Sequence, residues 1–418
     1  MNRIHKLVNA VIIMSVLGFS LPVHAYQIPD PSSQDGGSQE VTPQDKAPHD
    51  VAPPDPVPQD RVSPDPGTQD KVSPDPVPQD KVTRDPAPQD NVARDPTHLG
   101  AASQDKALVS KGSAKVVASC VSRAALWCDR GDMASLNLLD GPGGKEHEPA
   151  GKFTFVKEDM NGTSPKFDIE DEHGVHWRAK LGEEARAETA ATRLVWAAGY
   201  FTDEDYYLPE LRVEKMPRLH RGRQYVSANG VVRGVRLERR LNGQKKSENW
   251  SWFKNPFVGT KELNGLKIMM ALINNWDLKE NNNAIYNEKG AGPRYVVSDL
   301  GASFGETGNV ITRSKSNPGD YVGSKFLQKV TATKVDFFLS SRPFVLSVFD
   351  VSNYASRTHM QSIVKDIPVA DAKWLGTLLG QLSDEQIRDC FRAAGYSPDA
   401  VEGYTAVIKD RIKDLNQL

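Results

Sequence analysis

A low-complexity region rich in proline and aspartate fills residues 26–112, with a repeat at 56–95, and limits how much of the chain can fold. Its unit is ten residues long, and residues 56–65, Pro-Val-Pro-Gln-Asp-Arg-Val-Ser-Pro-Asp, are one copy. Large apolar side chains are nearly absent there, so burial cannot offset the conformational entropy lost on folding. Proline at this density favours extended polyproline II segments. We therefore expect a disordered, semi-rigid linker, or alternatively a docking surface for an envelope component or a proline-recognising module.

Residues 1–25 have the layout of a secretory signal peptide. A basic start at residues 1–6 precedes a mostly apolar run at 7–21, and residues 23–25, Val-His-Ala, suit a cleavage site. The apolar run is short and interrupted for a membrane span, which leaves an uncleaved anchor as the less favoured alternative. The sequence therefore predicts an exported protein, either periplasmic or secreted.

Residues 113–418 have the composition of a globular domain. Six of the seven tryptophans lie between Trp127 and Trp276. About 300 residues are enough for a two-lobed domain with a substantial core. The formal net charge of −2 gives no basic surplus for nucleic acid, so we expect no nucleic-acid partner.

Three cysteines fit an oxidising compartment only loosely. Cys120 and Cys128 are the natural disulfide pair, which would leave Cys390 unpaired, and buried free thiols are the alternative. No Cys/His spacing in the chain resembles a structural zinc site.

The order of predicted elements indicates an α+β fold with a small β-rich lobe, about 113–245, and a helical lobe, about 246–418. Alternation and turn residues predict strands, and apolar residues at helical spacing predict helices. The predicted strands are 153–157, 166–169, 175–181 and 235–238, and residues 294–298 are a further strand-like run. The predicted helices are 183–198, 260–274, one opened by a capping box of Ser383 and Gln386, and a last one that begins at Pro398.

Two short acidic motifs follow predicted elements in the second lobe. The first runs Asn-Trp-Asp-Leu-Lys-Glu-Asn-Asn over residues 275–282, and the second runs Val-Ser-Asp-Leu-Gly over 297–301. In phosphoryl transfer one Asp can orient a hydroxyl nucleophile, while an Asn and a second Asp hold the metal that neutralises phosphate charge. The spacing therefore points to Asp277 in the first role and to Asn282 and Asp299 in the second.

With a lysine near the end of the third strand, these motifs resemble the protein-kinase-like superfamily, most nearly its atypical phosphatidylinositol-kinase-like and HipA-type branches. The resemblance covers roughly residues 153–305. It implies a bilobed kinase-like fold, ATP and Mg²⁺ as cofactors, and transfer of a phosphoryl group to an unknown hydroxyl acceptor that is protein, lipid or small molecule. The His-Arg pair usual before the catalytic Asp is replaced by Asn275 and Trp276, which departs from ordinary protein kinases.

The resemblance also implies roles for residues in both lobes. Lys180 would contact the nucleotide phosphates, and Glu188, or Glu184 one turn earlier, would hold that lysine. In the second lobe, Lys279 would touch the transferred phosphate, and Asn283 is a neighbouring alternative to Asn282 as a metal ligand.

Two loops complete the implied site. The turn between the first two strands would cover the phosphates through Gly162, Thr163 and Ser164, although a plain hairpin turn is the alternative. Residues 306–325, rich in Gly, Ser, Thr and Asn, would form the activation or substrate loop.

Two other functions compete with phosphoryl transfer. The fold could serve as a catalytically inactive binding module of the envelope or the extracellular space, extended from a surface by the repeat region. Residues 301–305 also satisfy G-x-S-x-G, which would make Ser303 a hydrolase nucleophile. That motif must lead into a helix and be followed by an acid and a His, whereas residues 306–309 start a helix poorly and His359 is the only later histidine.

Overall fold

The computed structural model describes residues 123–240, 245–287, 290, 292–309 and 312–418. The predictions for the signal peptide, for the repeat region and for Cys120 lie outside the described residues. The chain divides into two units, Met1–Asn91 and Val92–Leu418, and every element below belongs to the second. Among the described residues, no helix combines the length and the apolar character that crossing a membrane requires.

Five strands close into a barrel in the order β1-β2-β3-β5-β4. All neighbours pair antiparallel except β1 with β4, which are parallel. Alternate residues point inward and form an apolar core. The strands are β1 (Phe153–Asp159), β2 (Lys166–Asp171), β3 (His176–Leu181), β4 (Asp205–Glu214) and β5 (Val231–Arg240). The inward side chains include Phe167, Ile169, Trp177, Ala179, Val235 and Leu237.

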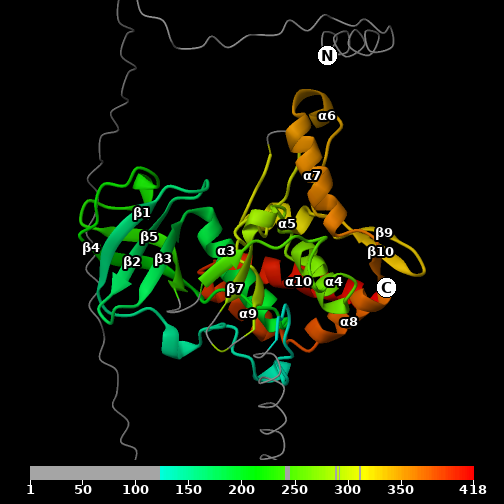
Figure 1. The fold of residues 1–418 in the computed structure, drawn as a ribbon, viewed down its shortest axis with the longest axis horizontal. Helices are drawn as coiled ribbons and strands as arrows, with labels where there is room; N and C mark the ends of the chain where they lie inside the picture. Colours follow the sequence, from blue (N-terminus) through cyan, green and yellow to red (C-terminus); the bar gives the residue numbers. More distant parts are fainter. Residues whose placement is uncertain (1–122, 241–244, 288–289, 291, 310–311) are drawn as a thin grey trace, which may run out of the picture. The chain divides into compact units, whose positions relative to one another are not determined.

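Helix α3 (Glu183–Ala197) follows β3 directly and packs against both the barrel and the helical part (Figure 1). It begins after Gly182 and ends before Gly199, which adopt φ values of +90° and +96° that side chains other than glycine rarely take. Small residues on its buried face, such as Ala187 and Ala191, let neighbouring elements approach closely. The helix therefore fixes the position of acidic residues in its first turns relative to β3.

The second part of the domain is mainly helical, with two small sheets. Its helices are α4 (Lys261–Leu272), α5 (Pro318–Gly323), α6 (Leu346–Phe349), α7 (Val351–Ile363), α8 (Val369–Leu379), α9 (Asp384–Ala393) and α10 (Pro398–Gln417). One sheet has the order β6-β7-β8, from strands Lys245–Glu248, Asn283–Asn287 and Arg294–Val297. The other has the order β11-β10-β9, from Ile367–Pro368, Lys334–Phe337 and Leu327–Val330.

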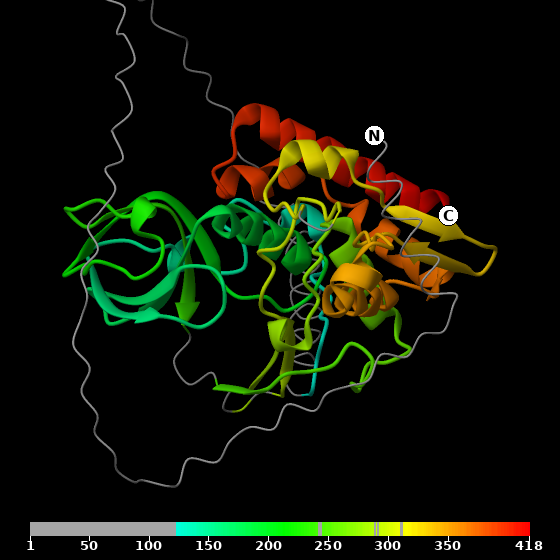
Figure 2. The same cartoon turned by 90° about the horizontal axis from the view of Figure 1, so that it is seen from above.

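The C-terminal helix holds the end of α4, from which the loop with Asp277 departs. Figure 2 shows α10, in red, alongside α5, and the two helices are in contact. The buried Arg411 guanidinium donates hydrogen bonds to the carbonyl oxygens of Ala271 at 3.1 Å and Leu272 at 2.8 Å. The Ala271 carbonyl also accepts from the Asn274 N–H at 3.0 Å, and the Leu272 carbonyl accepts from the Tyr321 hydroxyl at 2.5 Å. Arg411 therefore reinforces the end of α4 as a buried cap.

The predicted fold class is confirmed: a β-rich first lobe with one helix precedes a mainly helical second lobe. The strands, the helix after β3, the capping box of Ser383 and Gln386, and the helix from Pro398 all form. Strand β8 forms within the strand-like run at 294–298, whereas β4 and the other strands of the two small sheets were not predicted. Cys390 is free and buried, and Cys128 is in a disulfide.

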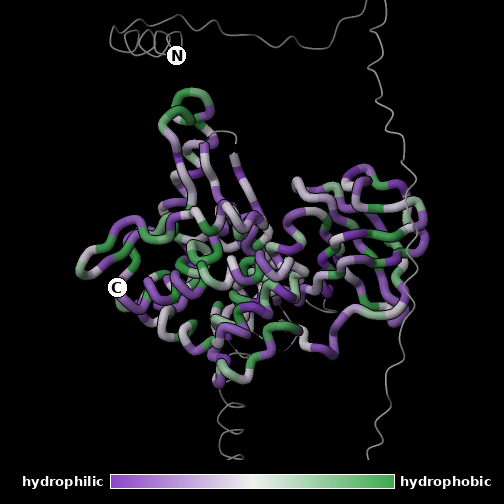
Figure 3. The backbone as a smooth tube through the Cα atoms, turned by 180° about the vertical axis from the view of Figure 1, so that it is seen from behind, coloured by the Kyte–Doolittle hydropathy of each residue, from purple (hydrophilic) through white to green (hydrophobic). Residues whose placement is uncertain are grey.

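A projecting end of the helical part is unusually apolar. Helices α6 and α7 extend away from the remaining helices (Figure 1), and Figure 3 shows hydrophobic residues at their tip. Phe344 is 79% exposed and Phe349 is 78% exposed.

Candidate active site

Three carboxylates surround the ammonium group of Lys180 at the end of β3. Its Nζ lies 2.8 Å from Glu188 Oε2, 3.2 Å from Glu184 Oε2 and 3.2 Å from Asp299 Oδ1. The two glutamates come from the first turns of α3, and Asp299 follows β8. The structure therefore brings together residues 119 positions apart that the sequence assigned to one site.

Lys180 is only 6% exposed, so its charge depends on these partners. Burial alone would lower the pKa of Lys180, but Glu188, Asp299 and Glu184 together raise it above its ordinary value. The side chain therefore stays protonated at neutral pH and presents a fixed positive charge beside Asp299.

Both glutamates considered for the lysine partner contact it, and they differ in their other partners. Glu188 Oε2 also lies 3.3 Å from Nε of the buried Arg236. Arg236 in turn pairs with Asp205 and, at 3.1 Å, with Glu238. Glu188 is therefore fixed by a buried network of the barrel.

Glu184 joins three segments that are distant in the sequence. Besides Lys180, its carboxylate accepts hydrogen bonds from Lys315 Nζ in the 306–325 loop and from Ser164 in the β1–β2 turn. Although burial opposes ionisation, Lys180 and Lys315 lower the pKa of Glu184 to about 2. This ionised carboxylate therefore anchors the loop to α3.

The β1–β2 turn reaches the site through one of its three predicted residues. Ser164 contacts Glu184, whereas Gly162 and Thr163 are exposed. The Arg221 guanidinium donates to the carbonyl oxygens of Gly162 at 2.6 Å and Asp159 at 2.8 Å, which holds the turn against the β4–β5 connection.

The loop after α4 is tied to Asp299 by the buried Asn275. Its side-chain amide donates to the Asp299 carbonyl oxygen at 3.3 Å, and its Oδ1 accepts from the Asp277 backbone N–H at 3.3 Å. Asp277 Oδ1 lies 2.7 Å from Lys279 Nζ. Asn275 was noted only as a departure from the family pattern, and its role as a bridge could not be read from the sequence.

The two predicted metal ligands flank the same end of the β7–β8 hairpin. Asn283 pairs with Val297 in the sheet, and the Ser298 backbone N–H donates to the Asn282 carbonyl oxygen at 2.9 Å. The Asn282 side-chain amide donates to the Asp277 carbonyl oxygen at 2.7 Å. Asp277, Asn282 and Asp299 are thereby held close to one another.

The donors present fit a hard divalent cation such as Mg²⁺. The side chain of Asp299 is 41% exposed, so its carboxylate is accessible to a ligand, and carboxylate and amide oxygens are the ligands that Mg²⁺ prefers. Within the described part of the chain, no group of three or more His, Cys, Asp or Glu side chains could hold a metal ion by itself. Phosphate oxygens and water would have to supply the remaining ligands, as is usual for Mg²⁺.

Close packing at Gly301 gives a first testable prediction. A Cβ at this position would lie 2.9 Å from Glu184 Cβ. We expect Gly301→Ala to displace Glu184 from Lys180 and to lower the free energy of unfolding by about 1–3 kcal/mol, measured by urea denaturation. Gly323→Ala is the matched control, because nothing lies within 4 Å of its Cβ. Equal stabilities of the two variants would show that the contact at Gly301 is not tight.

The serine-hydrolase alternative is wrong. Ser303 is 0% exposed, so its hydroxyl is closed to substrate. The next helix described after it is α5 (Pro318–Gly323), so the motif does not lead directly into a helix as a nucleophile elbow must. Ser303 is a packing residue of the second lobe.

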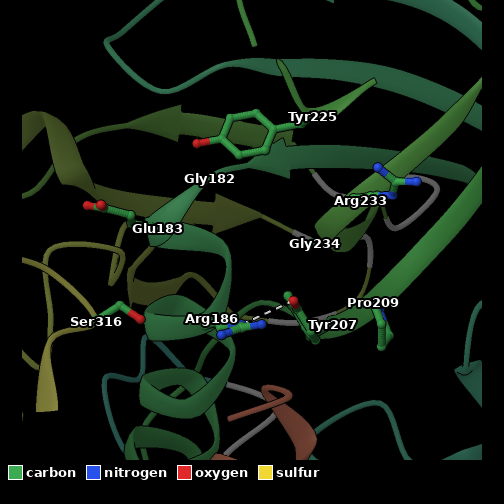
Figure 4. Close-up of a pocket in the computed structure, with 9 residues that line it drawn as sticks. All are labelled: Gly182, Glu183, Arg186, Tyr207, Pro209, Tyr225, Arg233, Gly234 and Ser316. Carbon is green, nitrogen blue, oxygen red and sulfur yellow. Dashed lines mark hydrogen bonds between the residues drawn. The ribbon is translucent and has the colours of Figure 1, made fainter. Parts of the chain in front are cut away.

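A separate cavity of about 480 Å³ lies beside the start of α3 (Figure 4). Arg186 Nε donates to the Tyr207 hydroxyl at 3.1 Å on one of its walls. The lining residues are Gly182, Glu183, Arg186, Tyr207, Pro209, Tyr225, Arg233, Gly234 and Ser316. None of the predicted site residues is among them, so the chemistry of the Lys180 cluster is not located there.

No family model matches the chain, and no curated protein matches it. The chain is similar to the solved structure of a Helicobacter pylori proinflammatory kinase, CtkA, with 11% identity and a TM-score of 0.35 over 63% of this chain and 96% of that one. It is also similar to the Golgi casein kinase with Mn/ADP bound, with 10% identity and a TM-score of 0.38 over 78% of this chain and 92% of that one. Both of these structural neighbours are kinases.

Proposed function

We propose that residues 113–418 form a metal-dependent phosphotransferase of the atypical kinase-like type, which transfers a phosphoryl group from ATP to a hydroxyl acceptor. The observation that carries the proposal is the 3.2 Å contact between Lys180 and Asp299 across the two lobes. A buried cation beside an accessible carboxylate is suited to a phosphate chain whose charge is shared between a lysine and a metal ion.

Each residue has a distinct part in this proposal. Lys180 neutralises phosphate oxygens, and Glu188 keeps its ammonium group in place. Asp299 and Asn282 would hold Mg²⁺, which supplies further charge neutralisation when bound. Asp277 orients the acceptor hydroxyl and takes its proton as the oxygen bonds to phosphorus and the bond to the leaving diphosphate breaks. Lys279, whose Nζ pairs with Asp277, would meet the transferred group.

Export remains part of the proposal and raises the question of a phosphate donor, because ATP is scarce outside the cytoplasm. An exported enzyme would act where ATP is available, for instance after delivery into another cell, or would use a different donor. The acceptor is proposed only as a hydroxyl compound, and an envelope contact through the repeat region is a separate proposal.

The test compares the full chain with Asp277→Asn in two assays. At a free concentration 100 times its dissociation constant, ATP with Mg²⁺ should raise the free energy of unfolding of both proteins by about 2.7 kcal/mol, as measured by thermal unfolding. Transfer of radiolabelled phosphate should fall at least ~10²-fold in the variant, because it loses the group that orients the hydroxyl. Asp366→Asn, with a side chain 77% exposed, is the matched control and should keep full activity.

The two assays separate the hypotheses. Binding without transfer in the unmodified chain would favour a catalytically inactive binding module. Absence of binding to any triphosphate would refute both the enzyme and a nucleotide-binding module. Unchanged transfer in Asp277→Asn would remove that residue from its proposed role.

A further inference from the structure

The face of the barrel that carries Lys180 is charged throughout. Alternate residues of a strand share a face, and the register of β2, β3 and β5 aligns these positions side by side. The aligned set is Lys166, Asp168 and Glu170 on β2, His176, Arg178 and Lys180 on β3, and Arg236, Glu238 and Arg240 on β5. The intervening residues, such as Ala179 and Leu237, fill the barrel instead.

Lateral ion pairs hold this face in place. Arg178 Nε lies 2.9 Å from Asp168 Oδ1, and Arg178 Nη1 lies 3.3 Å from Asp159. On the next strand, Glu238 lies 3.1 Å from Arg236 and 2.7 Å from Arg240. These charges are therefore already paired, and an apolar group bound between them would leave them without partners.

The acceptor side of the site lies toward the 306–325 loop. Trp276 precedes Asp277 in the chain. The centroid of the Trp276 ring lies 5.4 Å from Arg313 Cζ and 5.6 Å from Lys315 Nζ. Lys315 also binds Glu184, so this loop borders the site at the α3 end of β3. A donor held by Lys180 must then extend in the opposite direction along β3, toward Arg178. Residues two apart in a strand have Cα atoms about 6.6 Å from each other.

Small-molecule sites are lined mainly by apolar and aromatic side chains, with a few polar groups that fix orientation and specificity. Here one wall consists of ion pairs, although an aromatic ring or a guanidinium can stack on any base.

We propose, resting on the proposed function, that this site selects its phosphate donor by the polyphosphate chain rather than by the base. Purine and pyrimidine nucleoside triphosphates would serve alike as donors. Inorganic tripolyphosphate would compete with them, because it offers the same anionic oxygens to Lys180 and to a metal held by Asp299.

The experiment uses the full chain with Mg²⁺ and measures phosphate transfer from ATP, GTP, CTP and UTP. We expect KM values within about tenfold of one another, since stacking discriminates poorly among bases. Tripolyphosphate should inhibit competitively with ATP, and adenosine at the same concentration should not inhibit. A pair of variants is then compared. Arg178→Leu adds an apolar surface to the charged face of the barrel, and Arg233→Leu makes the same change on the exposed part of β5. Adenosine should inhibit only Arg178→Leu.

The outcomes distinguish this inference from the function on which it depends. A preference for ATP of about 100-fold or more, or inhibition of the unmodified chain by adenosine, would overturn the inference and leave the phosphotransferase standing. No transfer from and no binding of any triphosphate would overturn the phosphotransferase itself. If Arg178→Leu does not fold, the donor series with the unmodified chain still decides.

Discussion

Asp299→Asn is expected to lower phosphoryl transfer by ~10³-fold or more, because a bound metal contributes several kcal/mol of charge stabilisation and its carboxylate ligand would be lost. The substitution keeps the size of the side chain, and its amide oxygen can still accept the hydrogen bond that Gly301 N–H donates at 3.2 Å. Lys180 keeps Glu184 and Glu188, so the fold should persist. The defect should therefore be one of catalysis and metal binding.

Two measurements check this expectation. Single-turnover transfer of radiolabelled phosphate gives the rate, and a Mg²⁺ titration in the presence of ATP gives the concentration that stabilises the chain against heat. Asp299→Asn should require far more Mg²⁺ than the unmodified chain to reach the same thermal stabilisation. Asp399→Asn, in the exposed first turn of α10, is the control and should require as much Mg²⁺ as the unmodified chain. The same Mg²⁺ dependence in both variants would exclude Asp299 as a metal ligand.

The parts of the site that could be predicted are those marked by local sequence. Lys180 ends an alternating strand, Glu188 lies on the helix that follows, and Asp299 follows a β-branched run. Each belongs to a short pattern whose neighbours in the chain determine its structure. Their convergence followed only from resemblance to a family, because nothing local specifies how β3 meets β8.

The missed contacts depend on pairing between distant segments. Arg236 sits in an ordinary alternating strand, and only the register with β3 places it beside Glu188. Lys315 lies in a loop of small polar residues that carries no periodicity. Strand β4 contains Pro209, and a proline in the sequence argues against a strand. Proline is tolerated here because the pairing of β4 with β5 does not need a backbone N–H donor at this position. Long-range register therefore limits prediction more than residue chemistry does.

The same register makes Arg236 the residue whose loss should most destabilise the domain. It is 2% exposed and faces three carboxylates, those of Glu188, Asp205 and Glu238. Arg236→Met would keep much of the volume but leave buried negative charge without its main partner. Breaking a buried ion pair on one side costs about 3–5 kcal/mol, so urea denaturation at pH 7 should show a loss of that size. Arg233→Met, three residues earlier and 71% exposed, should change stability by less than about 1 kcal/mol.

The loss should depend on pH in a defined direction. In the unmodified chain, burial raises the pKa of Glu238, but Arg240 and Arg236 lower it overall, so its ionised form contributes stability above the unfolded pKa that is lost as pH falls. Without Arg236 the balance shifts toward burial, which raises the folded-state pKa values of Glu238 and Glu188, and protonation of these carboxylates then relieves the variant. The difference in unfolding free energy between Arg236→Met and the unmodified chain should therefore shrink from pH 8 to about pH 5. A difference that stays constant over this range would mean that lost packing, rather than uncompensated charge, destabilises the variant.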